Sequence, residues 1–332
     1  MLNKKNKFFK IIAASIQRSR FLSSRAGTLL AIMLAYGSCG LADSGYSKSI
    51  GPTQLRIEQD DEAGTIAVYR ADGKEPIVTQ NARPGFRPYL HPIIAPDGNG
   101  ELTENSPGHH RHQTGLYWGF TRVNGQPVPK DTIKKRNKEW HRKSGGKGGD
   151  KPAELVKAHG RDFFHHPESD YWRRDSATVI QALGEEVKWQ TVYAMLDEAG
   201  KSIMTETQSW TMRADGDKFI LDLEWTGAAQ TDITIGEYDY GGLFLRMPYR
   251  KDIRGEAINA ARQRNQQAEG KRAQWVDVGM EIEGRDDLGH IAIFDHPDNV
   301  GFPQSWRVDG QLGVGPARSR MGDWHIKKGS SE

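Results

Sequence analysis

The chain has 332 residues and a formal net charge of +3, a length that allows one large domain or two smaller ones. It contains a single cysteine, Cys39, which excludes an intrachain disulfide framework. A domain of this size can instead rely on its own apolar core.

The first 42 residues have the pattern of a signal peptide. Residues 1–25 carry seven basic side chains and no acid, an apolar run follows at 26–36, and the small residues Gly40 and Ala42 precede Asp43. The apolar run is too short to span a membrane. We predict export to the periplasm or beyond, with cleavage after Ala42 and no transmembrane segment in the mature chain; lipidation at Cys39 and an uncleaved anchor are the alternatives. Cleavage would take the net charge from +3 to −4, which argues against a nucleic-acid partner.

Short segments of alternating apolar and polar residues recur along 43–332 and predict β-strands. Turns rich in Asp, Gly and Asn separate them. Helical periodicity is almost absent, so we predict an all-β fold, a large antiparallel β-sandwich in one domain. The candidate strands are 55–59, 65–69, 89–94, 115–121, 177–183, 188–196, 202–213, 218–226, 232–235, 242–247, 275–282 and 290–294.

Two segments depart from this pattern. Residues 130–151 contain nine Lys or Arg and few apolar side chains, so 126–158 is predicted to be a solvated or flexible insertion that is dispensable for folding. A loop that binds a polyanion is the alternative. Residues 255–267 could form one helix, but it would be polar all round and more typical of a mobile flap than of a core element.

Histidines are concentrated at one point of the sequence. His109, His110 and His112 lie between a Ser-Pro-Gly turn signal and an aromatic strand segment. Imidazole titrates near neutral pH and is the commonest metal ligand, and His110 and His112 share one face of an extended backbone. We interpret the cluster as a site for substrate binding or proton transfer, with a metal site or a structural polar network as alternatives. A cupin-type metal site would need a carboxylate soon afterwards, and Gln113 begins a run without one.

Arg87, Tyr89 and His91 alternate along the preceding strand candidate and therefore share a face. An arginine can bind a carboxylate, and a tyrosine ring can stack on a sugar. The prolines that flank His91 also fit a simple edge strand, which is the structural alternative.

Two later segments carry further polar candidates. Tyr238 and Asp239 precede a Gly-Gly pair and Arg246, and a carboxylate here could act as a general base opposite an imidazole acid. Asp295 and His296 end an apolar strand in a turn rich in ligating groups. A solvated strand end and ordinary Asx-turn chemistry are the alternatives.

Taken together and in this order, these segments resemble the PmoA-like family of exported bacterial proteins labelled "methane oxygenase PmoA". The matching motifs are Arg-Pro-Tyr-x-His-Pro, Pro-x-His-His-x-His, Tyr-x-Gly-Gly-Leu-x-x-Arg and Ile-Phe-Asp-His-Pro-x-Asn, and the resemblance covers roughly residues 52–125 and 160–325. The family's activity is unassigned, and its label implies a metal-dependent oxygenase. The insertion at 126–158 and an early end after Trp324 depart from the family pattern, so the last strand is expected to be truncated. The layout is also similar to the galactose-mutarotase-like supersandwich.

We therefore predict an exported protein that binds or acts on a small-molecule or glycan ligand, a carbohydrate, in a polar cleft. As an enzyme it would use one imidazole as acid and one carboxylate as base. The alternatives are a metal-dependent oxygenase and a non-catalytic glycan-binding module; the sequence assigns no metal ligands and no cofactor. The catalytic candidates are His110, His112, Asp239 and His296, and the binding candidates are Arg87, Tyr89, His91, His109, Tyr238, Arg246 and Asp295.

Overall fold

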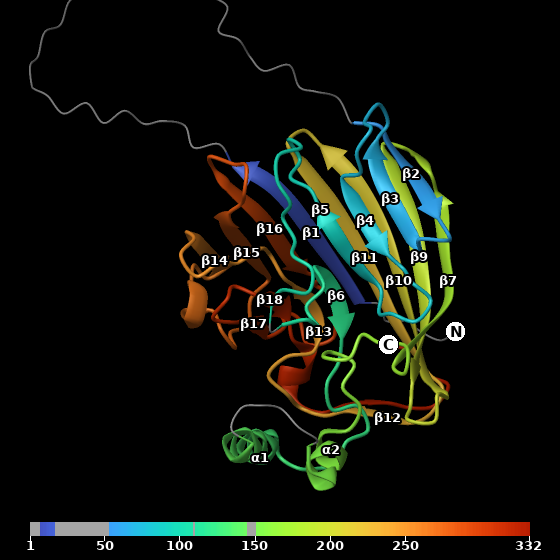
Figure 1. Cartoon of the computed structure of the whole chain (residues 1–332), viewed down its shortest axis with the longest axis vertical. Helices are drawn as coiled ribbons and strands as arrows, with labels where there is room; N and C mark the ends of the chain where they lie inside the picture. Colours follow the sequence, from blue (N-terminus) through green and yellow to red (C-terminus); the bar gives the residue numbers. More distant parts are fainter. Residues whose placement is uncertain (1–6, 17–52, 109, 145–150) are drawn as a thin grey trace, which may run out of the picture.

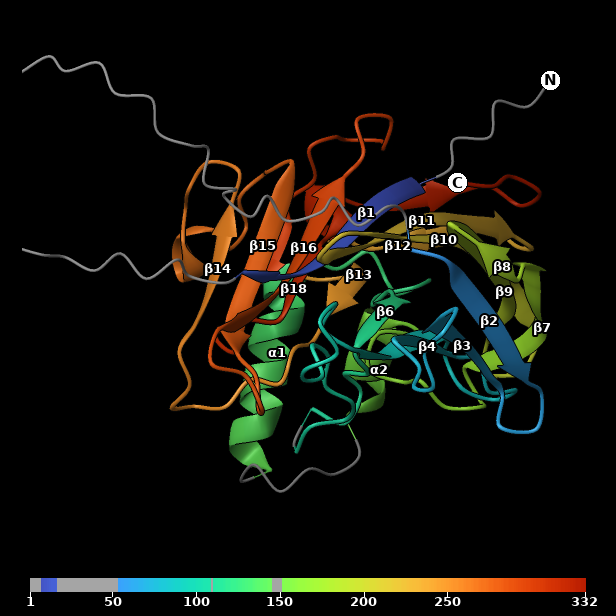
Figure 2. The ribbon, with the colours of Figure 1, turned by 90° about the horizontal axis from the view of Figure 1, so that it is seen from above.

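The computed structural model describes residues 7–16, 53–108, 110–144 and 151–332. Two large antiparallel sheets, of eight and nine strands, make up most of the described chain and lie as two layers (Figures 1 and 2). The predicted all-β sandwich is confirmed. No helix among the described residues is long and apolar enough to cross a membrane.

The eight-stranded sheet has the order β14-β15-β16-β1-β11-β10-β9-β7. Its long strands alternate buried and partly exposed side chains, as the sequence pattern requires for a sheet with one face on the core. The strands are β1 (Lys7–Ile16), β7 (Trp172–Gln181), β9 (Glu186–Leu196), β10 (Ser202–Asp215), β11 (Lys218–Ala229), β14 (Gly255–Asn259), β15 (Trp275–Glu281) and β16 (Leu288–Asp295).

The nine-stranded sheet has the order β17-β18-β13-β6-β5-β4-β3-β2-β8. A separate two-stranded sheet pairs β12 (Ile233–Ile235) with β19 (Trp324–Ile326). The nine strands are β2 (Leu55–Asp60), β3 (Thr65–Arg70), β4 (Val78–Asn81), β5 (Tyr89–Ile93), β6 (Leu116–Gly119), β8 (Leu183–Gly184), β13 (Gly242–Leu245), β17 (Trp306–Val308) and β18 (Val314–Pro316).

Aromatic side chains join the two sheets. Trp118 of β6 stacks on Trp225 of β11, with ring centroids 4.6 Å apart and planes 17° from parallel. Below them the buried carboxyl of Glu206 accepts hydrogen bonds from the indole of Trp225 (2.9 Å) and the amide of Gln208 (2.8 Å). Large apolar rings therefore supply the core, and the one carboxyl among them is hydrogen-bonded.

Strand β1 is the largest difference from the sequence prediction. Residues 7–16 were assigned to a signal peptide outside the fold, whereas they form an inner strand between β11 and β16 (Figure 1). The reason is a period of two: Phe9, Ile11 and Ala13 are all buried, so one face of this basic segment is apolar. Cleavage after Ala42 stays a prediction.

The insertion also differs from its prediction. Its described part forms α1 (Lys130–Lys143) and α2 (Ala153–His159), which lie beyond one end of the sheets (Figure 1). Ile133, Leu155 and Ala158 are buried against one another. Sparse apolar residues were sufficient because they gather on the facing sides of two short helices.

The helix expected at 255–267 is wrong. Residues 255–259 form β14, which pairs with β15, and a single 3-10 turn, η1 (Asn265–Gln267), follows. The side chain of Asn265 accepts a hydrogen bond from the backbone of Ala257 at 2.9 Å and fixes this turn. In a strand, successive side chains point to opposite faces, with a period of two. Plotted with the helical period of 3.6, the same residues do not form one apolar face, so the segment looked polar all round.

Candidate functional site

One hairpin lies between two regions that contain predicted site residues. Gly115 donates its backbone N–H to the carbonyl of Glu104 (2.8 Å), and Ser106 donates to the carbonyl of Gln113 (2.7 Å). Gly115 has φ +67°, and a Cβ there would lie 2.3 Å from the carbonyl oxygen of Leu90. The absence of a side chain at Gly115 therefore lets the returning arm pass close to the backbone of β5. The loop end of the hairpin carries His110 and His112.

On one side of this hairpin lies a group of imidazole and phenol rings that we term the histidine–tyrosine cluster. The rings of His110 and His112 are 5.7 Å apart, and those of His112 and His165 are 4.4 Å apart. Of the predicted residues the cluster contains His110, His112 and Tyr238. Its members are His110, His112, His159, Asp162, His165, Tyr238 and Tyr240.

A buried carboxylate orients two of these imidazoles. Asp162 accepts hydrogen bonds from Nδ1 of His165 (2.8 Å) and Nε2 of His159 (3.2 Å), and its other oxygen accepts the backbone N–H of His165 (3.1 Å). Burial alone would raise the pKa of Asp162, but the two histidines outweigh it and hold the pKa well below its ordinary value. The carboxylate therefore stays ionised, and Nε2 of His165 points to the hydroxyl of Tyr240 at 3.5 Å.

Three other rings of the cluster have pKa values shifted in favour of their neutral forms. Burial lowers the pKa of His112 to about 2, and the neighbouring His165 and Arg87 lower it further. Burial raises the pKa values of Tyr238 and Tyr240. At neutral pH the cluster thus offers an uncharged imidazole and two phenols beside an Asp–His pair, the groups needed for acid–base chemistry.

Helix α1 covers the edge of this cluster. Lys134 forms an ion pair with Asp239, and Lys130 forms one with Glu237. Burial would raise the pKa of Asp239, but Lys134 lowers it, so the carboxylate is ionised and paired. Asp239, predicted as a general base, is therefore occupied by a lysine of the insertion.

Arg87 and Tyr89 do not face a ligand site. Arg87 is fully buried and donates to the carbonyls of Phe163 (3.1 Å), Phe164 (2.7 Å) and His112 (2.5 Å). Tyr89 is buried in an aromatic group with Phe164. Both were predicted to bind substrate; instead Arg87 ties the two halves of the histidine–tyrosine cluster together, because its forked donors reach carbonyls on both.

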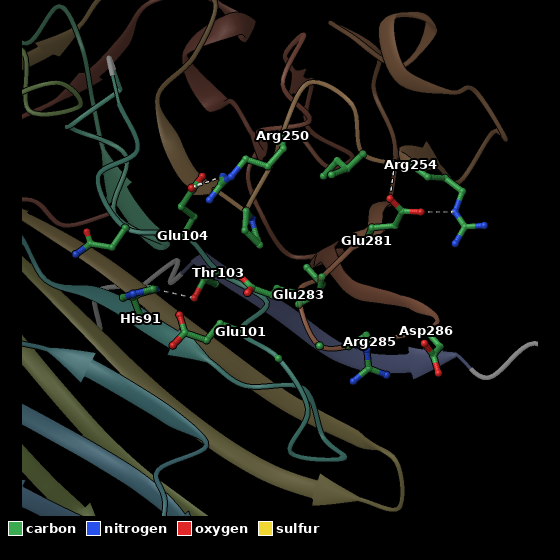
Figure 3. A pocket seen from close by; sticks show the side chains of 16 residues that line it. His91, Glu101, Thr103, Glu104, Arg250, Arg254, Glu281, Glu283, Arg285 and Asp286 are labelled. Atoms are coloured by element: carbon green, nitrogen blue, oxygen red, sulfur yellow. Dashed lines mark hydrogen bonds and ion pairs between the residues drawn. The ribbon is translucent and has the colours of Figure 1, made fainter.

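On the other side of the hairpin lies the charged cleft, with a volume of about 910 Å³ (Figure 3). His91 lies at one end, and its Nδ1 is 3.0 Å from the hydroxyl of Thr103. Burial lowers the pKa of His91, although Glu101 and Glu104 act to raise it. The charged and polar lining residues are His91, Glu101, Thr103, Glu104, Asn105, Arg250, Arg254, Glu281, Glu283, Arg285 and Asp286.

Every arginine in the charged cleft has a carboxylate partner. Arg250 pairs with Glu104 at 2.5 Å, Arg254 with Glu281 at 3.3 Å, and Arg285 with Asp97 outside the cleft at 2.6 Å. Arg246, a predicted binding residue, is buried behind the wall, where it donates to Glu104 (3.4 Å). It therefore supports a lining carboxylate and does not contact the cleft itself.

In contrast, three lining carboxylates have no partner. Within the described parts of the chain, the side chains of Glu101, Glu283 and Asp286 take part in no hydrogen bond or ion pair. Figure 3 shows Glu101 next to His91, and Glu283 further along the lining toward Arg285. These acceptors are available to a ligand.

Asp295 and His296 belong to a turn elsewhere. Asp295 is buried and accepts hydrogen bonds from the side chain of Asn299 (2.7 Å) and the backbone of Gln304 (2.7 Å). Nδ1 of His296 accepts the backbone N–H of Asp298 at 3.2 Å. The turn explains both residues, so their prediction as site residues is not supported by their contacts. His109 lies outside the described residues.

The described ranges contain no set of side chains arranged as metal ligands. No group of three or more His, Cys, Asp or Glu side chains there is arranged to hold an ion. In the histidine–tyrosine cluster, His159 and His165 each direct a ring nitrogen at Asp162, so hydrogen bonds already use these donor atoms.

The Asp162–His165 pair was not among the site residues predicted from the sequence. A signal existed: Asp162 and His165 are separated by two residues shortly after α2, and Asp-x-x-His is a spacing at which a carboxylate can reach an imidazole. Glu101 was also missed, because a single exposed glutamate has no distinguishing pattern. Only the fold places it beside His91.

Comparisons with known proteins give a family but no activity. A family model described as "Family of unknown function (DUF6807)" matches residues 65–332. No curated protein matches the chain. A solved structure, cyanobacterial PsbP (CyanoP) from Synechocystis sp. PCC 6803, is similar over 57% of this chain and 85% of that chain, with 15% identity and a TM-score of 0.12, which carries no argument. Because the family model spans the charged cleft, the histidine–tyrosine cluster and most of both sheets, the chain belongs to the DUF6807 family.

Proposed function

We propose that this protein binds a carbohydrate in the charged cleft. The observation that carries the proposal is a cleft of about 910 Å³ with unpaired carboxylates beside a histidine of lowered pKa. A pocket of this volume accommodates a small oligosaccharide. Both oxygens of a carboxylate accept hydrogen bonds from hydroxyl groups, and an uncharged imidazole can donate or accept one, so the lining complements a ligand rich in hydroxyl groups.

Charge narrows the class of sugar. Five acidic and three basic side chains line the cleft, and all three arginines are already paired. A ligand carboxylate would meet uncompensated Glu101, Glu283 and Asp286, and like charges in a partly buried site repel. We therefore propose neutral or amino sugars in preference to uronic acids.

Calorimetric titration of the full chain with neutral, amino and uronic oligosaccharides tests this proposal. Glu101→Gln combined with His91→Ala should weaken binding of a neutral sugar by at least about tenfold, since a hydrogen bond to a charged acceptor is weakened and one to the imidazole is lost. Glu62→Gln, an exposed acid at the tip of the β2–β3 hairpin, is the matched control and should bind normally. Binding that the double substitution leaves intact, or a preference for uronic acids, would place the ligand elsewhere.

A second candidate function is acid–base catalysis at the histidine–tyrosine cluster. It is favoured by one specific contact, the 2.8 Å hydrogen bond that holds the His165 ring to an ionised Asp162. Such a carboxylate fixes the imidazole tautomer and leaves Nε2 to exchange a proton. Proton NMR of sugars incubated with the protein would detect epimerisation, elimination or hydrolysis. His165→Asn should abolish turnover, whereas His166→Asn, its exposed neighbour, should not; equal effects of both would remove this candidate.

Export and the PmoA-like resemblance stay proposals. N-terminal sequencing of protein from the native host tests export: a start at Asp43 supports it, and an intact Met1 in the cytoplasm counts against it. The oxygenase implied by the family label needs a bound metal, and the described residues offer no ligand set for one. Elemental analysis of the purified protein would test this alternative.

A further inference from the structure

Strand β1 closes the eight-stranded sheet from within. Eight consecutive residues, 7–14, pair antiparallel with β11, and eight, 9–16, pair antiparallel with β16. Figures 1 and 2 both show β1 between these strands. Without it, β11 and β16 would face each other across a gap one strand wide, with their backbone donors and acceptors unpaired.

The side chains of β1 fit this position. Phe9 is 1% exposed, Ile11 and Ala13 are 0% exposed, and the ring of Phe9 lies 5.7 Å from that of Trp118 on the opposite sheet. On the outer face Lys10 lies 3.7 Å from Asp222 of β11. The slot therefore selects an extended segment with apolar residues at alternate positions.

The C-terminal residues pair with the same edge of β11 as β1 does. Glu332 and Gly227 exchange two backbone hydrogen bonds, of 2.9 and 3.1 Å, and Ser331 bridges Ala228. The other edge of β11 is taken by β10, where Gly227 pairs with Glu206. Since Lys7 pairs with Trp225, only Thr226 of β11 separates the C-terminal pairing from β1, and both segments run in the same direction.

We propose that the gap between β11 and β16 is a strand-acceptor site whose occupant is the segment Lys7–Ile16. Residues 17–52 separate this strand from the next described residue, so the site receives it from a distant part of the chain. The alignment with Glu332 means that the same strand, attached after the C-terminus, would enter in the same direction and register. Removal of residues 1–42 by processing would empty the site. This inference is independent of the proposed ligand.

A pair of neighbouring substitutions in the full chain tests the assignment. Ile11 faces the core and Ile12 the outer surface, so Ile11→Asp should lower the thermal midpoint by about 10 °C or more, because it buries an unpaired charge. Ile12→Asp should produce no more than about a third of that shift. Equal, small shifts for the two variants would overturn the proposal, because a leader outside the fold is indifferent to strand phase.

A rescue experiment keeps the proposal testable if Ile11→Asp fails to fold. One serine followed by a copy of residues 7–16 is added after Glu332 of the Ile11→Asp chain, which restores the register across Thr226. The wild-type copy should recover the original midpoint, whereas a copy that itself carries the Ile11→Asp change should not. Failure of the wild-type copy to rescue, or rescue by both copies, would show that the site does not accept this strand.

Discussion

His112 is a largely buried imidazole beside positive charges, and it should make the protein sensitive to acid. Burial, with the neighbouring His165 and Arg87, lowers its pKa to about 2 in the folded state. In the unfolded chain a histidine has a pKa of about 6.5. Between these two pKa values the unfolded state binds a proton and the folded state does not. The free energy of unfolding is therefore highest, as far as His112 is concerned, above about pH 6.5, and it decreases as the pH falls below that value.

The size of the effect follows from the two pKa values. A pH of 4.5 is two units below the pKa of the histidine in the unfolded chain. Protonation of this histidine therefore stabilises the unfolded state by about 2.7 kcal/mol relative to neutral pH. His112→Gln removes the titrating group but keeps a polar side chain. The variant should therefore lose about 2–3 kcal/mol less stability than the wild type between pH 7.5 and pH 4.5.

Urea denaturation at the two pH values measures this difference directly. His166→Gln is the matched control, because His166 is exposed, stacks on Tyr171 and lies 3.6 Å from the exposed Glu168, and it should follow the wild type. If His112→Gln shows the same pH dependence as the wild type within about 0.5 kcal/mol, the ring is not held neutral by burial and the reasoning fails.

Three further substitutions probe the framework. Burial raises the pKa of Glu206 to about 7, so the carboxyl stabilises the fold at low pH and loses this contribution as the pH rises through 7; Glu206→Gln should remove about 2 kcal/mol of alkaline destabilisation between pH 5.5 and 8.5, measured by urea titration, and an unchanged profile would contradict it. Gly115→Ala should cost about 2 kcal/mol or more in the same assay, because its Cβ would meet the Leu90 carbonyl, and a neutral result would show that the hairpin yields. Arg87→Lys should cost about 2–4 kcal/mol, because lysine cannot span three carbonyls on two separate segments; a loss below about 1 kcal/mol would mean that water replaces the guanidinium.

The class of fold could be predicted from the sequence because, in a strand with one face on the core, every second side chain is buried and therefore apolar. The segments 188–196, 202–213 and 218–226 alternate in this way and correspond to β9, β10 and β11. Strand β1 has the same alternation at Phe9, Ile11 and Ala13, but its basic residues and its position fit a leader equally well. Local pattern gives the phase of a strand, and only the partners β11 and β16 decide whether it is used.

The candidate site was predictable only in part. The sequence singled out His112 and Tyr238, which the fold brings into one cluster, and His91, which it places in a cleft. It could not separate His91 from His112, because only the fold places His91 in the charged cleft and the ring of His112 against His165. Nor could it join His112 to His165, which lie more than fifty residues apart.

The sequence by itself thus determined where chain segments alternate, turn and concentrate imidazole. The tertiary structure decided which side chains remain available. Arg87 and Asp295 have the same chemistry as ligand-binding residues, yet carbonyls, amides and a turn satisfy them in the fold. Glu101, with no motif around it, has no partner among the described residues and faces the cleft. Availability depends on whether the fold provides a partner within hydrogen-bonding distance, and that is a property of distant segments which no local pattern contains.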